Sequence, residues 1–173
     1  MEFFEAVAAR HSTRAYSAKA VPESSIAKIL AAASASPVGM GRYDTLKLTA
    51  VTTPAAAAAL HAKILALFDG QDPLYGAPAF ILVSSAADPA APFNVGCVME
   101  NMLLAAAAEG LGSCYIGGAI PAIAGDAELV KELGIPEGFT PMAGIAFGFP
   151  KDEAELASRK DLAAPGKIAV SRL

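Results

Sequence analysis

The sequence predicts an α+β fold in which one sheet carries helices on its faces. Residues 46–51 begin with the period-two alternation of a half-buried strand. Residues 79–83 form a continuous apolar run bounded by Pro78 and Ser84, which is typical of a strand that is covered on both faces and lies centrally in a sheet. Helix and strand patterns are mixed rather than strictly alternating, which disfavours a doubly wound fold.

The remaining elements follow from periodicity and from helix start and stop signals. We expect helices that begin at Phe3 and Glu23 and further helices over 54–68, 93–111 and 126–133, with strands over 113–116 and 142–149. The 93–111 helix is apolar nearly all round, so we expect it to be central and the most buried. An apolar stretch at 168–170 could add a strand to the edge of another sheet.

The chain length of 173 residues suits one domain over 1–173, with a more charged tail over 151–173. Hydrophobic residues make up 54% of the chain and charged residues 17%. Soluble domains typically contain about 45–50% and about 25% of these classes. This composition provides more apolar residues than a typical soluble domain has, so some apolar surface would stay uncovered. A buried subunit interface is one explanation for this excess.

Charge and hydropathy argue against two kinds of partner. The net charge of −4 is unsuited to sequence-independent binding of nucleic acid, which requires clustered cations. The longest apolar stretch, 95–108, is interrupted by Glu100 and Asn101 and falls short of the ~20 residues that cross a bilayer. Acidic residues at positions 2 and 5 do not fit a secretory signal, so we expect a cytoplasmic protein that binds neither nucleic acid nor a membrane.

Cysteine and histidine are too few and too scattered for a metal centre. Cys97 and Cys114 form no Cys-x-x-Cys pair, and we expect both thiols to be reduced and buried. His11 and His61 are the two histidines of the chain, and His61 is expected on the surface of an Ala-rich helix.

A cationic segment over 10–14, Arg-His-Ser-Thr-Arg, follows the first helix. Two guanidiniums and two hydroxyls within five residues can converge on a phosphate or another anionic oxygen cluster. The alternative is that Arg10 is a cation at a helix C-terminus, that Ser12 or Thr13 forms a turn, and that Arg14 is a solvated charge.

Two glycine-containing segments can approach a flat ligand. Gly117 and Gly118 leave backbone N–H groups accessible, and the 36–43 loop carries Gly39 and Gly41 next to an aromatic residue. Ordinary turns would have similar sequences. The chain lacks the Gly-x-Gly-x-x-Gly, phosphate-loop and Gly-x-Ser-x-Gly motifs, which argues against Rossmann-type binding, phosphate-loop ATP use and serine hydrolysis.

Taken in order, these segments resemble the FMN-dependent nitroreductase family, in particular its short members with a Gly-Met-Gly loop. The matching motifs are Arg-x-Ser-x-Arg at 10–14, Gly-Met-Gly at 39–41, Tyr-Gly-Ala-Pro at 75–78, Glu-Asn-Met at 100–102, Gly-Ile-Pro-Glu-Gly at 134–138 and Gly-Phe-Pro at 148–150. The resemblance implies a central, mostly antiparallel sheet and an intertwined homodimer with a flavin at each interface. It also implies a C-terminal extension that reaches the partner subunit.

The resemblance further implies a set of FMN-binding residues. Arg10 and Ser12 would hold the phosphate with His11 beside it, and Arg14 would lie near the pyrimidine edge of the flavin. Along the ring would lie Pro37, Val38, Gly39 and Met40, and an N–H of Gly117 or Gly118 would face flavin N5. A second phosphate cation would be Arg159 or Lys160.

The activity implied by the resemblance is ping-pong transfer of hydride from NADPH or NADH through flavin N5 to a small electron-poor acceptor such as a nitroaromatic or a quinone. It requires no catalytic side chain. Residues 41–44 stand where the family has Asn-x-Gln-Pro-Trp, and the chain has no Trp. Two alternatives therefore stay open: a non-catalytic flavin-binding storage or sensor protein, and a dimeric scaffold without flavin.

Overall fold

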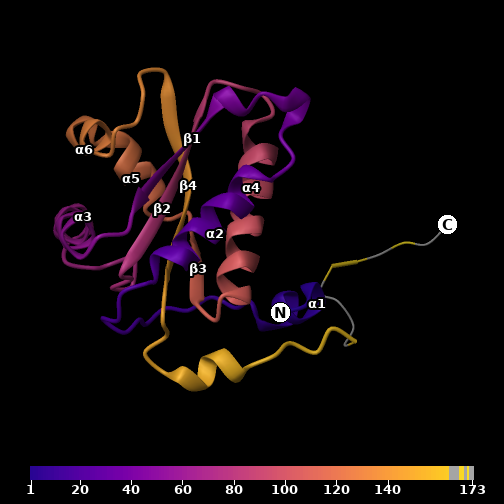
Figure 1. The fold of residues 1–173 in the computed structure, drawn as a ribbon. Coiled ribbons are helices and arrows are strands. Elements are labelled where there is room, and N and C mark those ends of the chain that lie inside the picture. The colour runs from indigo at the N-terminus through magenta and orange to yellow at the C-terminus, as the bar shows by residue number, and fades with distance from the viewer. Residues whose placement is uncertain (164–167, 170, 172–173) are drawn as a thin grey trace.

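A four-stranded sheet with the order β1-β2-β4-β3 organises the computed structural model, which describes residues 1–163, 168–169 and 171 (Figure 1). All three strand pairings are antiparallel. The strands are β1 (Leu46–Val51), β2 (Ala79–Ala86), β3 (Gly112–Ile116) and β4 (Phe139–Gly148). The predicted α+β fold with an antiparallel sheet is confirmed, and β2 is a central strand as expected.

The helices start where the sequence offers starting signals. Pro22 precedes α2, the Thr53 hydroxyl caps α3, and the Asp126 carboxylate caps α6. The helices are α1 (Phe3–Ala9), α2 (Glu23–Ser34), α3 (Pro54–Leu67), α4 (Ala91–Ala108), α5 (Ile120–Gly125) and α6 (Ala127–Glu132), with 3₁₀ turns η1 (Gly39–Gly41), η2 (Tyr43–Thr45) and η3 (Glu153–Ala157). Among these helices, α5 has no counterpart in the elements predicted from the sequence.

Helices cover both faces of the sheet (Figure 1). Ile81 and Val83 point to the side of α2 and α4, whereas Phe80 and Leu82 point to the side of α3, α5 and α6. This alternation gives the molecule two apolar cores, one on each face of β2. The apolar run at 79–83 reflects this double coverage, although β2 continues beyond it to Ala86.

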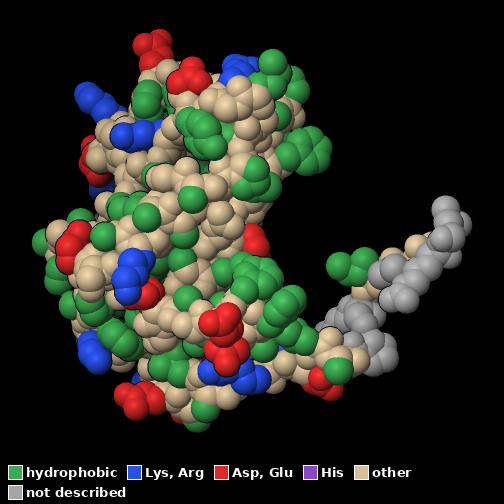
Figure 2. Space-filling model, turned by 45° about the vertical axis from the view of Figure 1, so that its right-hand side comes forward, with side chains coloured by type: hydrophobic (Ala, Val, Ile, Leu, Met, Phe, Trp, Pro, Cys, Tyr) green, Lys and Arg blue, Asp and Glu red, His purple; other side chains and the backbone are tan. Residues whose placement is uncertain are grey.

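The long helix α4 carries more buried residues than any other described helix, as expected, but one of its faces is exposed. Met99 and Met102 are fully buried, but Phe93, Gly96 and Cys97 are exposed, and Phe93 is 76% accessible. This exposed face borders the hollowed side of the molecule in Figure 2. In length and composition α4 could cross a membrane, but half of it is buried inside the protein, so this single helix is weak evidence for a span.

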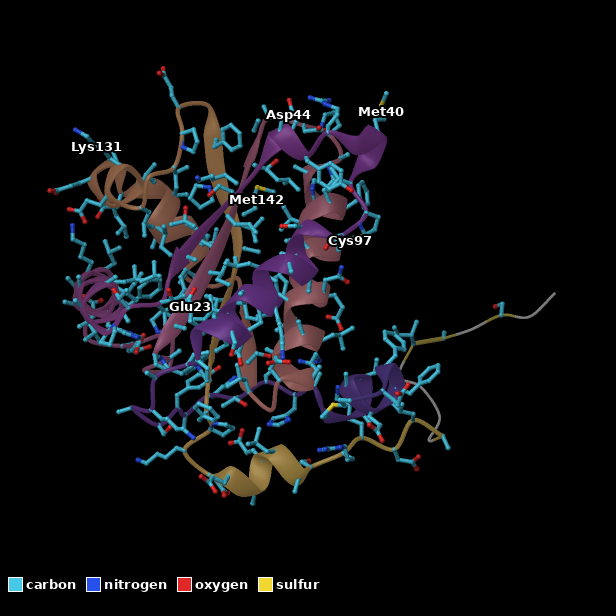
Figure 3. All side chains as sticks on the ribbon, in the orientation of Figure 1. Glu23, Met40, Asp44, Cys97, Lys131 and Met142 are labelled. Atoms are coloured by element: carbon cyan, nitrogen blue, oxygen red, sulfur yellow. The ribbon has the colours of Figure 1, made fainter. Side chains whose placement is uncertain are left out.

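Two side chains differ from their expected burial. Cys97 is exposed on the outer side of α4 (Figure 3), whereas Cys114 is buried in β3 as expected. His61 is half-buried rather than on the surface, because its Nε2 donates to the carbonyl oxygen of Ala77 at 2.8 Å and its Nδ1 lies 3.0 Å from the Asp72 carboxylate. This histidine ties α3 to the loop before β2.

The C-terminal tail runs back along the N-terminal segment. Lys151 N donates to Ala15 O at 2.9 Å, and Lys160 N donates to Ala8 O at 2.9 Å, so the two segments are antiparallel. Of the stretch expected to form a strand at 168–170, residue 170 lies outside the described residues, and residues 168 and 169 are not in a strand of this chain.

Candidate functional site

The cationic segment over 10–14 leaves α1 in an extended conformation beside β3. Arg10 is the C-cap of α1, with φ −62° and ψ 119°. Ser12 forms a parallel bridge with Ser113, and Thr13 N donates to Ser113 O at 3.0 Å. Side chains of an extended segment alternate between two faces, so positions 10, 12 and 14 share one face and positions 11 and 13 share the other.

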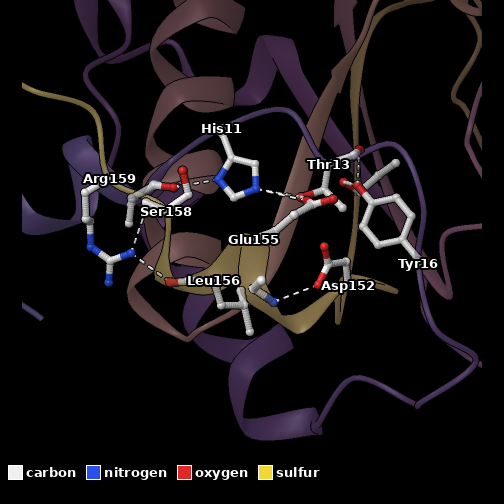
Figure 4. Close-up of polar contacts among 11 residues, drawn as sticks. His11, Thr13, Tyr16, Asp152, Glu155, Leu156, Ser158 and Arg159 are labelled. Atoms are coloured by element: carbon white, nitrogen blue, oxygen red, sulfur yellow. Dashed lines mark hydrogen bonds and ion pairs between the residues drawn. The ribbon is translucent and has the colours of Figure 1, made fainter.

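The face that carries His11 and Thr13 meets the tail (Figure 4). Glu155 lies in η3, and its Oε2 accepts hydrogen bonds from His11 Nε2 and Thr13 Oγ1, each at 3.0 Å. His11 Nδ1 lies 2.8 Å from the carbonyl oxygen of Ala9. Both ring nitrogens of His11, which was predicted to line a phosphate site, therefore already have partners in the protein.

By the same alternation, Arg10, Ser12 and Arg14 lie on the opposite face of the segment, which runs beside β3. Burial raises the pKa of Cys114, and the nearby Arg14, the Ser12 hydroxyl and Arg10 each counter part of that rise. The Arg14 guanidinium also lies 6.0 Å from the centre of the Tyr75 ring, at the outer limit of a cation–π contact. The three side chains expected to bind an anion are therefore gathered on one face near β3.

The tail adds one of its two candidate cations to this group. Lys160 lies at the end of α1 beside Arg10, because its backbone N donates to Ala8 O at 2.9 Å and its Nζ donates to Val7 O at 3.3 Å. Burial and then the positive charge of Arg10 lower the pKa of Lys160. Arg159 is turned onto its own segment, because its Nη1 donates to Leu156 O at 2.7 Å and Ser158 O at 2.8 Å. Of the two, Lys160 is placed to act together with Arg10.

The two glycines expected near flavin N5 follow β3 directly. Gly117 and Gly118 are exposed, and a Cβ on Gly118 would meet nothing within 4 Å. Within the described ranges, the N–H of neither glycine takes part in a turn or loop hydrogen bond. These amides are free to donate to a ligand.

The 37–40 loop lies at the other end of α4. Val38 is buried, whereas Met40 is 96% exposed and adopts φ 56° at the loop tip (Figure 3). The loop is held by Asn94 of α4, whose Oδ1 accepts from Gly39 N at 2.9 Å. Pro37 and Gly39 are exposed beside it.

One chain does not bring this loop to the arginines. Arg10 lines a small cavity together with Ala107 and Gly110, at the C-terminal end of α4, whereas Asn94 holds the loop near the N-terminal end. The 18 residues of α4 span about 27 Å, and Figure 1 shows α1 and η1 at opposite ends of the molecule. Within one chain, the loop and the arginines therefore lie at opposite ends of α4.

Several residues of this site were not found from the sequence. Glu155 and Thr13 lack a local pattern that links them, because their contact depends on how the tail packs. Asn94 offered a signal, as a polar residue on the buried side of an apolar helix. Arg42 of the altered 41–44 loop forms an ion pair with Asp88 at 3.2 Å, a contact that fixes this loop to the segment before α4. Among the described residues, the His, Cys, Asp and Glu side chains form no group of three that could hold a metal ion.

Comparison with solved structures finds the same architecture in flavoproteins. A nitroreductase with bound FMN from Bacteroides fragilis is 29% identical with a TM-score of 0.81, and the match covers 99% of this chain and 100% of that one. A nitroreductase with bound FMN from Desulfitobacterium hafniense shares the fold at 23% identity, with a TM-score of 0.80 and coverage of 99% and 100%. The NADPH:FMN oxidoreductase from Vibrio harveyi complexed with NAD⁺ shares it at 21% identity, with a TM-score of 0.71 and coverage of 98% and 78%.

The sequence itself matches a family model over most of its length. The match is to the nitroreductase family, and it extends over residues 7–149. It includes the cationic segment, the 37–40 loop, α4 and the glycine pair, and it ends before η3. The chain belongs to the nitroreductase family.

Proposed function

We propose that this protein binds FMN and acts as an NAD(P)H-dependent oxidoreductase, which reduces a small electron-poor acceptor such as a nitroaromatic or a quinone by a ping-pong mechanism. The observation that carries the proposal is the gathering of Arg10, Ser12 and Arg14 on one face, with Lys160 beside Arg10. Within the described part of the chain, neither Arg10 nor Lys160 forms an ion pair. Like charges that are held together and not bound in an ion pair fit a ligand phosphate.

The residues present fit FMN by their chemistry. Arg10 and Lys160 would bind the phosphate, and the Ser12 hydroxyl would donate a hydrogen bond to it. Arg14 would hold a positive charge near the pyrimidine edge, where it stabilises negative charge on the reduced ring. An N–H of Gly117 or Gly118 would donate to the ring at N5.

When bound, FMN supplies the redox chemistry, since its N5 atom accepts a hydride and the reduced ring passes electrons to a second molecule. The protein contributes position and charge, and no side chain has to transfer a proton to or from a substrate. The site agrees with this, because the groups gathered there are arginines, a lysine and free amides, which bind and orient a ligand.

A second copy of the chain would complete the site. The 37–40 loop of one chain lies at the far end of α4 from its own arginines, and the exposed face of α4 between them carries Phe93, Gly96 and Cys97. We propose a homodimer that buries this face and brings the loop of one subunit to the cationic segment of the other. The contact would also cover apolar surface that a monomer leaves open.

The visible spectrum of the purified protein tests the proposal. We expect a yellow protein whose flavin band bleaches within minutes when NADPH or NADH is added without oxygen, and returns when a quinone or a nitroaromatic follows. A yellow protein that neither nicotinamide bleaches would instead indicate storage or sensing. A colourless protein that does not take up added FMN would contradict flavin binding altogether.

A further inference from the structure

Residues 151–160 of the C-terminal tail, here called the strap, run along the cationic segment and α1. Main-chain hydrogen bonds hold this strap at both ends, from Lys151 to Ala15 and from Lys160 to Ala8. Glu155 lies between them in η3, whose first turn is capped by the Asp152 carboxylate through Ala154 N at 3.0 Å. The strap therefore presents the Glu155 carboxylate at a fixed point of the segment.

Glu155 is the strap residue whose side chain contacts the face of the cationic segment that carries His11 and Thr13. We call this face the back face. Its Oε2 accepts from His11 Nε2 and from Thr13 Oγ1 at 3.0 Å each, and Thr13 is fully buried (Figure 4). Because positions 11 and 13 lie on the back face, their fixation determines where positions 10, 12 and 14 point. A rotation of the segment would break both contacts at once.

Glu155 acts on this segment through short contacts at defined atoms. His11 faces an acceptor at each ring nitrogen, Ala9 O at 2.8 Å and Glu155 Oε2 at 3.0 Å. The contribution that we infer for Glu155 is therefore geometric.

We propose that Glu155 is a positioning residue for phosphate recognition: by binding His11 and Thr13 it turns Arg10 and Ser12 toward the FMN phosphate. This inference rests on the proposed function. It concerns a residue outside the stretch that matches the family model, which ends at residue 149. It would couple the tail, which brings Lys160, to the arginine segment.

The test compares two ligands that differ only in the phosphate. FMN and riboflavin are titrated by flavin fluorescence against the wild type, Glu155→Ala and Glu155→Gln. We expect Glu155→Ala to weaken FMN binding about tenfold, which corresponds to about 1.4 kcal/mol, and to leave riboflavin binding unchanged. Glu155→Gln keeps one oxygen that accepts from Thr13 and should show a smaller loss.

The matched control is Glu153→Gln, which removes an acid from the same 3₁₀ turn. Glu153 is exposed, and within the described residues its side chain makes neither a hydrogen bond nor an ion pair. Both affinities should stay at the wild-type value in this variant. Thermal melting of all variants shows whether they remain folded, and the isosteric Glu155→Gln keeps the test valid if Glu155→Ala does not fold.

Four results would overturn the inference. Equal losses for FMN and riboflavin would indicate a general structural role, and tighter FMN binding would indicate that Glu155 merely repels the phosphate. Unchanged FMN binding in both Glu155 variants would show that Glu155 has no positioning role, and it would leave the proposed function intact. Failure of the wild type to prefer FMN over riboflavin would refute the phosphate site itself, and the role of Glu155 with it.

Discussion

Lys160 of the tail lies next to Arg10 at the end of α1, so that two cations from the two ends of the chain are neighbours. Burial and the charge of Arg10 both lower the pKa of Lys160. Its backbone N–H is fixed to Ala8 O at 2.9 Å, and its Nζ donates to Val7 O at 3.3 Å. An anion bound between the two would relieve their repulsion, which makes Lys160 a sensitive probe of the proposed phosphate site.

We expect Lys160→Met to weaken FMN binding about tenfold, because a charge-assisted hydrogen bond to the phosphate would be lost. Wild-type affinity should also fall as the pH rises toward the lowered pKa of Lys160, since the neutral amine no longer attracts the phosphate. Lys160→Arg should remove that fall, because arginine stays charged. Fluorescence titration from neutral to alkaline pH measures both effects.

The control for this lysine is Arg159→Ala, which should bind FMN as the wild type does. The Arg159 guanidinium donates to carbonyl oxygens of its own tail segment. A loss in this variant as large as in Lys160→Met would show that the tail acts as a whole rather than through one cation.

Arg14→Ala should lower FMN affinity and make the flavin harder to reduce, because a positive charge near the pyrimidine edge stabilises the anionic reduced ring. In Arg14→Lys the reduction potential should stay close to the wild-type value, since the positive charge remains. An anaerobic redox titration of the three proteins measures the effect. The assignment of Arg14 would be wrong if the potential and the flavin content were both unchanged in Arg14→Ala.

Gly112→Ala should destabilise the protein by about 1–3 kcal/mol through overpacking. A Cβ on Gly112 would collide with the Thr13 hydroxyl, lie 2.9 Å from Thr13 Cβ and lie 3.0 Å from Pro150 Cγ. Thr13 is fully buried and bonded to Glu155, so it has little room to move. Urea unfolding measures the change, with Gly125→Ala as control because its Cβ would meet nothing within 4 Å. Equal stability of the two variants would contradict this close contact.

Glu109 should contribute stability that acid removes. The hydrogen bond from Lys28 at 2.8 Å, and then that from Ser25, lower the pKa of Glu109 from its usual 4.5 and join α2 to the end of α4. Because the folded pKa is the lower one, this stability is complete above pH 4.5 and is lost as the pH falls through the folded value.

We therefore expect Glu109→Gln to be less stable than the wild type at pH 7 by up to about 1 kcal/mol, as for a largely solvated ion pair. The difference should shrink as the pH falls below 4.5. Urea unfolding at several pH values measures it, with the exposed Glu137→Gln as control. A difference that persists at low pH would assign the effect to packing instead of charge.

Much of the fold could be predicted because it follows from local periodicity. The 79–83 run identified a central strand, and Pro22, Pro54 and Asp126 marked where helices begin. The α5 helix was missed because six residues with a glycine at their end resemble a turn. The exposed face of α4 could not be predicted, because apolar residues all round a helix fit both a buried core and a surface that a partner covers.

The site was predictable in its residue types but not in its geometry. The spacing of Arg10, Ser12 and Arg14 follows from the period of an extended segment, and the structure places all three near Cys114. The bonds of Glu155 with His11 and Thr13 could not be predicted, because they depend on the path of the tail across the fold. The sequence also could not show which of Lys160 and Arg159 lies beside Arg10, because this depends on the Arg159 side chain, which folds back onto Leu156 O.

The length of α4 has a genetic consequence. If a loop and a cationic segment from different subunits share each ligand, a variant damaged only at Arg14 and a variant damaged only at Asn94 each lack one half of every site. Hybrids formed by mixing the two would restore one intact site in each mixed molecule and lose the other completely. Mixing two inactive variants would then give partly active heterodimers, an effect known as intersubunit complementation.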